Sequence, residues 1–61
     1  MPIITVEMLE GRTLEQKRAM VEAVTKSVCE TCNCPKEAVT IVIHELPKTN
    51  IAKEGKLLSE S

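Results

Sequence analysis

Two residues near the start of the chain, Pro2 and Arg12, carry the nitrogen groups best suited to chemistry. If the initiator methionine is removed, Pro2 carries a free secondary amine. An apolar pocket beside a cation would lower the pKa of that amine, because burial and like charge both disfavour its protonated form. Such an amine can act as a general base or as a nucleophile towards carbonyls. The plainer alternative is a proline that only starts an edge strand.

Arg12 follows the first predicted strand and directly precedes a predicted helix. An arginine beside free helix amides can form an anion site. The alternative is a solvated loop arginine. A whole strand separates Arg12 from Pro2, so a shared site needs a fold or an oligomer that joins the two ends of that strand.

Three cysteines, Cys29, Cys32 and Cys34, form a C-x2-C-x-C cluster that could hold a metal with His44 as a fourth ligand. The spacing is weak evidence, because a closed zinc site usually draws its ligands from two separated pairs. Cys32 also continues the apolar side of a predicted helix, where a free cysteine acts as a small core residue. We therefore expect no metal, and a strand or interface histidine at position 44.

Periodicity predicts the elements that must position these residues. Alternation predicts a strand at about 3–9, and apolar spacing predicts a helix at about 14–32 behind a capping box, Thr13-Leu14-Glu15-Gln16. A second strand is predicted at about 39–46, and a short hairpin and tail at about 51–61. The predicted apolar stripe of the helix consists of Leu14, Val21, Val24, Val28 and Cys32, flanked by Met20.

The order of elements predicts an α+β fold: a βαβ unit with parallel strands, followed by a short C-terminal hairpin. At 61 residues the chain is one domain, 1–61, and it has no Phe, Tyr or Trp to enlarge its core. One helix leaves the second face of a two-stranded sheet uncovered. The second strand is nevertheless apolar on both sides, so we expect it to be buried on both faces, most economically by another copy of the chain.

Charge and hydropathy exclude several classes of partner. The net charge is −1 with both signs interspersed, so no basic surface for nucleic acid is expected. No apolar stretch approaches the roughly 20 residues of a membrane span, and no secretory signal is apparent. We expect a cytoplasmic protein whose thiols are reduced.

The chain resembles the 4-oxalocrotonate (2-hydroxymuconate) tautomerase family through Pro2-Ile3, Leu9-Glu10-Gly11-Arg12-Thr13 and Glu15-Gln16-Lys17. The resemblance implies one tautomerase-like domain and a homohexamer built as a trimer of dimers. It implies an isomerase without metal or cofactor, in which Pro2 is the general base for enol–keto proton transfer on a small unsaturated 2-hydroxy (enol) carboxylate. Arg12 would bind the substrate carboxylate, usually across a subunit boundary.

Two positions depart from the family's pattern and would also contact the substrate. Thr40 stands where classical members have a second arginine, and Ile51 stands where they have an aromatic residue. Two alternatives remain open. One is a hydratase or dehalogenase reaction in the same pocket, with Glu45 or Glu54 activating water. The other is a non-catalytic oligomeric module that binds a metal or a small anion.

Overall fold

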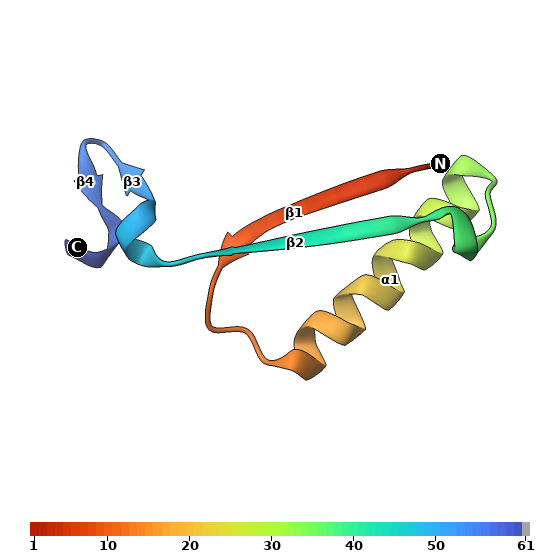
Figure 1. Ribbon diagram of the computed structural model, residues 1–61, viewed down its shortest axis with the longest axis horizontal. Coiled ribbons are helices and arrows are strands. Elements are labelled where there is room, and N and C mark those ends of the chain that lie inside the picture. The colour runs from red at the N-terminus through yellow and green to blue at the C-terminus, as the bar shows by residue number, and fades with distance from the viewer. Residues whose placement is uncertain (61) are drawn as a thin grey trace.

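A computed structural model describes residues 1–60 and contains a parallel βαβ unit followed by a small antiparallel hairpin (Figure 1). The order and type of these elements confirm the predicted fold class. The elements are β1 (Ile3–Leu9), α1 (Leu14–Cys32), β2 (Thr40–Leu46), β3 (Ala52–Lys53) and β4 (Lys56–Leu57), with 3₁₀ turns at Lys36–Ala38, Lys48–Asn50 and Leu58–Glu60.

β1 and β2 pair in parallel over their whole length, from Ile3 opposite Thr40 to Leu9 opposite Leu46. β2 begins one residue later than expected. The N–H of Val39 is used in the preceding turn, where it donates to the carbonyl of Lys36 at 3.2 Å, so Val39 does not join the ladder.

α1 lies on one face of this two-stranded sheet, where β1 and β2 present alternate, half-buried apolar side chains (Figure 1). The helix covers these side chains with Met20, Val21, Val24 and Val28, which are half-buried as predicted. The predicted ends of the stripe were wrong. Leu14 is 66% exposed and Cys32 is also exposed, because they are the first and last residues of the helix and no strand covers them.

The other face of the sheet is uncovered in the single chain, so the expectation that β2 is buried on both sides is not met within it. Ile3 is 65% exposed and Val42 is 39% exposed on this outer face. The side chains of the outer face are Ile3, Thr5 and Glu7 of β1, with Thr40, Val42 and His44 of β2.

The described chain has no fully buried residue, and its shape is elongated, at 43 × 23 × 13 Å. Its accessible surface is 4888 Å², whereas a compact monomer of this mass exposes roughly 3,900 Å². Its radius of gyration is 14.7 Å, against about 10.5 Å for a compact chain of this length. A single chain therefore lacks the closed core that normally supports a fold of this size.

The C-terminal hairpin extends beyond the end of β2, away from α1 (Figure 1). Glu54 and Gly55 form its two-residue turn with φ of 53° and 80°, which is the left-handed geometry of a tight hairpin. The N–H of Leu58 donates to the carbonyl of Ile51 at 2.8 Å and closes the hairpin against the preceding segment. Across residues 1–60, we find no helix with the length and apolar character needed to cross a lipid bilayer.

Candidate active site

Pro2 directly precedes β1 and is half-buried. The N-terminus lies at the end of the sheet where both parallel strands begin (Figure 1). The carbonyl oxygen of Pro2 accepts a 3.0 Å hydrogen bond from the N–H of Thr40, which fixes the first residue of β2 against the start of β1. The structure thus brings Pro2 and Thr40 together, two of the four predicted site residues. Met1 precedes Pro2 and is 85% exposed. While Met1 is attached, the Pro2 nitrogen is an amide and has no basic lone pair.

Arg12 lies in the turn between β1 and α1, at the opposite end of the sheet from Pro2. Its side chain is exposed and makes no hydrogen bond or ion pair within residues 1–60. Gly11, the residue before it, has φ of 117°, a conformation that glycine adopts readily, and this turns the chain from the strand towards the helix.

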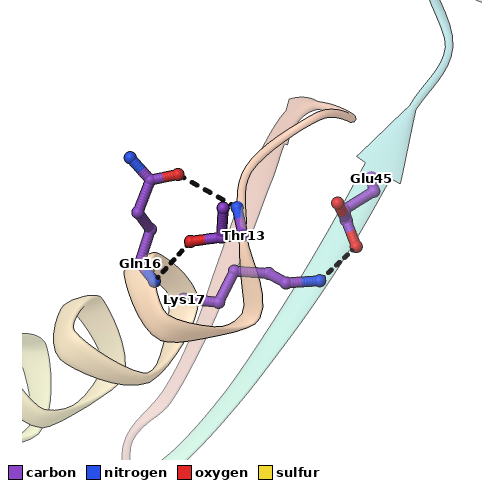
Figure 2. Close-up of polar contacts among 4 residues, drawn as sticks. All are labelled: Thr13, Gln16, Lys17 and Glu45. Atoms are coloured by element: carbon purple, nitrogen blue, oxygen red, sulfur yellow. Dashed lines mark hydrogen bonds and ion pairs between the residues drawn. The ribbon is translucent and has the colours of Figure 1, made fainter.

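The helix start next to Arg12 is fixed by the predicted capping box (Figure 2). The N–H of Gln16 donates to Thr13 Oγ1 at 3.1 Å, and the N–H of Thr13 donates to Gln16 Oε1 at 3.0 Å. These bonds satisfy two of the free amides of the first helical turn. Arg12 therefore stands on a rigid helix terminus while its guanidinium stays free for an anion.

Ile51 lies past the end of β2, at the base of the hairpin, and is half-buried. It belongs with Arg12 to the end of the sheet where the strands finish. The seven residues of β1 separate this end from Pro2 and span roughly 20 Å at the usual rise per residue. One chain therefore does not unite the four predicted residues in one site; it presents half of the set at each end of the sheet.

Glu45 and Lys17 form an ion pair that the sequence did not suggest (Figure 2). Lys17 Nζ lies 2.7 Å from Glu45 Oε1, and both side chains are partly exposed. The alternation of β2 explains the contact, because Glu45 points to the helix side of the sheet. The pair borders a shallow groove of about 340 Å³ that is lined by Leu14, Lys17, Arg18, Val21, Ile43 and Glu45. Glu45 is thus held by a lysine. It lies five residues along β2 from Thr40, the residue that is bonded to Pro2.

The cysteines and His44 do not form a common cluster. Within residues 1–60, no group of three or more His, Cys, Asp or Glu side chains is placed to hold a metal ion. His44 lies on the outer face of the sheet, where its Nδ1 is 3.6 Å from Glu7 Oε1 of the neighbouring strand. Cys29 and Cys34 are half-buried at the end of α1, whereas Cys32 is exposed.

The N–H of Cys34 donates to the carbonyl oxygen of Cys29 at 3.3 Å, a closeness that sequence reasoning missed. The signal was Asn33, which adopts the left-handed conformation at the end of α1 with φ of 54°. A residue in that conformation folds the chain back over the last helical turn, so positions before and after it meet.

Comparison with known proteins identifies relatives over almost the whole chain. A family model described as "Tautomerase enzyme" matches residues 2–61. The "2-hydroxymuconate tautomerase" of Bacillus subtilis is 50% identical over 60 residues, which are 98% of this chain and 97% of the relative. The crystal structure of YwhB, a homologue of 4-oxalocrotonate tautomerase, superposes with a TM-score of 0.94 at 48% identity and covers 98% of both chains.

A more distant structural neighbour is described as a heterohexamer 4-oxalocrotonate tautomerase from Chloroflexus aurantiacus. It superposes with a TM-score of 0.91 at 30% identity, over 98% of this chain and 97% of the neighbour.

Proposed function

The chain belongs to the 4-oxalocrotonate tautomerase family and is a tautomerase, and on this premise we propose that it converts a small enol carboxylate to its keto form. The observation that carries the proposal is that the family similarity begins at Pro2 and runs through Arg12 to the end of the chain. The proposed substrate class is an unsaturated 2-hydroxy acid, and the proposed reaction moves one proton between oxygen and carbon.

In this proposal Pro2, freed by removal of Met1, is the general base. Its secondary amine takes the proton of the enol hydroxyl and returns a proton to carbon, so that the enol becomes a ketone and no atom is lost. The half-buried position of Pro2 supports the role, because partial desolvation favours the neutral amine over its protonated form.

Arg12 is proposed to bind the substrate carboxylate of a site whose Pro2 comes from another copy of the chain. Within one chain, the strand between these residues is too long for one small acid to touch both. An assembly that places the Arg12 end of one sheet near the Pro2 end of another removes the difficulty. The large exposed surface of the single chain and its uncovered outer face support self-association, and a homohexamer is the proposed form.

Thr40 and Ile51 are proposed to complete the pocket. Thr40 is held directly beside Pro2 by the backbone hydrogen bond, so its hydroxyl can donate to the oxygen that becomes negative as the enol ionises. A neutral threonine stabilises this charge less than an arginine would. Ile51, brought from another chain together with Arg12, is proposed to exclude water from the amine.

A ketonisation assay tests the proposal. Protein whose mass shows the loss of Met1 is mixed with 2-hydroxymuconate, and the ketone is followed by absorbance. Pro2→Ala is expected to lose activity, and Arg12→Ala is expected to have a higher KM. Both variants should keep the wild-type fold and assembly. Equal rates for wild type and Pro2→Ala would remove Pro2 from the mechanism.

A further inference from the structure

The end of α1 brings two cysteines together around one backbone carbonyl. The N–H of Asn33 and the N–H of Cys34 both point at the carbonyl oxygen of Cys29, and the N–O distance from Cys34 is 3.3 Å. The bond from Cys34 spans six residues and is characteristic of a Schellman-type helix end. Side chains at its two positions frequently touch. In this chain both positions are cysteine.

The backbone geometry also allows a covalent bond between them. A 3.3 Å hydrogen bond between the carbonyl of Cys29 and the N–H of Cys34 keeps their Cα atoms within roughly 7 Å. Disulfides span Cα distances of roughly 4.4–6.8 Å. Both residues are half-buried on the same turn, whereas Cys32 is exposed, with its sulfur 4.0 Å from Thr31 Oγ1.

We propose that Cys29 and Cys34 are a reversible dithiol–disulfide site that covalently closes the end of α1, and that Cys32 takes no part in the bridge. The oxidant is a low-molecular-weight disulfide. The Cys34 thiolate attacks one sulfur of this reagent, whose S–S bond breaks and releases one thiolate. Cys29 then loses its proton and attacks the sulfur of Cys34, and the second small thiolate leaves. Two protein thiols are oxidised, and one small disulfide is reduced to two thiols.

The electrostatics of the pair indicate this order of attack. Partial burial raises the pKa of the Cys29 thiol, and the charge and hydrogen bonding of Cys34 raise it further. Cys29 therefore holds its proton more tightly than an ordinary thiol does and reacts second. Once Cys34 carries the small thiol, its negative charge is gone and no longer opposes ionisation of Cys29, which then becomes the resolving thiol.

The bridge would act on a segment that leads to the candidate active site. Pro35 and the 3₁₀ turn Lys36–Ala38 connect Cys34 to Thr40, whose N–H holds the carbonyl of Pro2. A disulfide at the helix end would restrict the unfolding of this connection. The oxidised protein is therefore expected to unfold at a higher temperature than the reduced one.

Mass spectrometry tests the pairing directly. Wild type and three single variants, Cys29→Ser, Cys32→Ser and Cys34→Ser, are treated with oxidised glutathione at mildly alkaline pH. Wild type and Cys32→Ser are expected to lose two hydrogen atoms through the bridge, with glutathione added to wild type only at Cys32. Cys29→Ser and Cys34→Ser are expected to carry glutathione on their remaining cysteines and to form no bridge.

Proteolysis and thermal unfolding complete the test. Cleavage after Glu30 separates Cys29 from Cys34 in the sequence, so in Cys32→Ser the two fragments stay joined only through the proposed bond. Reduction of oxidised Cys32→Ser should lower its unfolding temperature, whereas Cys34→Ser, which has no bridge to lose, should show no such decrease. A Cys32→Ser protein that carries two glutathiones, or that stays reduced while wild type forms a bridge, would overturn the proposal.

Discussion

The N–H of Thr40 donates a 3.0 Å hydrogen bond to the carbonyl oxygen of Pro2 and holds the proposed base at the start of the parallel sheet. This bond joins the first residue of β2 to the residue before β1, so the position of Pro2 depends on the βαβ crossover and not on the N-terminus alone. Thr40 also carries the hydroxyl that we propose as a hydrogen-bond donor to the ionising enol.

Replacing Pro2 tests the base. Pro2→Ala leaves a primary amine at the N-terminus after removal of Met1, and this amine lacks the ring that fixes the orientation of the proline nitrogen. General-base catalysis contributes roughly 10²- to 10⁴-fold to a rate, so kcat should fall at least about 100-fold. Circular dichroism and light scattering should match wild type. A Pro2→Ala protein with an unchanged kcat would contradict the assignment.

Replacing Arg12 tests carboxylate binding. A hydrogen bond to a charged group contributes about 1.5–3 kcal/mol, so Arg12→Ala should raise KM roughly 10- to 100-fold. The matched control is Arg18→Ala, which removes an exposed arginine at the edge of the groove beside α1 and should leave KM unchanged. Equal effects of the two substitutions would mean that net charge, and not a specific contact, governs substrate binding.

The capping box should set the stability of the helix on which Arg12 stands. Thr13→Ala removes the hydroxyl that accepts from the N–H of Gln16, and loss of such a cap costs about 1 kcal/mol in the free energy of unfolding. Urea denaturation at fixed protein concentration measures the change. Ser27→Ala, at an exposed position inside the same helix, serves as the control and should not destabilise the protein.

Glu45 should be structural. Glu45→Gln breaks the pair with Lys17, and because both side chains are partly exposed, less than about 1 kcal/mol of stability should be lost. Tautomerase activity should be unchanged under saturating substrate. A loss of kcat as large as that of Pro2→Ala would instead give Glu45 the water-activating role of a hydratase.

The outer face of the sheet should be an interface. Val42→Glu puts a charge into the middle of this face, where burial against another chain would be costly. Size-exclusion chromatography with light scattering should show a smaller or dissociated species. Ala23→Glu, at an exposed position on α1, is the control and should assemble as wild type does. Normal assembly of Val42→Glu would show that the outer face stays open to solvent.

Local rules predicted most of the fold. Thr13 and Gln16 marked the start of the helix, and alternation assigned the two faces of each strand. These signals work because each depends on neighbours within a few residues. The burial of Leu14 and Cys32 was wrong, because periodicity gives the direction of a side chain but not where the sheet beneath it ends.

The candidate site was less predictable, because its parts are far apart in the fold. Pro2 and Arg12 were singled out by residue type and by resemblance, whereas β1 separates them in the structure, so the proposed site needs residues from two chains. Contacts across chains leave no local pattern in a sequence. The Lys17–Glu45 pair depends on the packing of α1 against β2. The meeting of Cys29 with Cys34 depends on the reversal of the chain at the end of α1.

The most direct test of the central claim is the ketonisation rate of two preparations that differ only in whether the Pro2 nitrogen is free. The first is wild-type protein whose intact mass lacks Met1. The second carries a lysine inserted between Met1 and Pro2, which keeps the nitrogen acylated. Both are assayed with 2-hydroxymuconate and with a monocarboxylate enol such as phenylenolpyruvate. The account predicts turnover by the first preparation alone, and full activity in the second would contradict it.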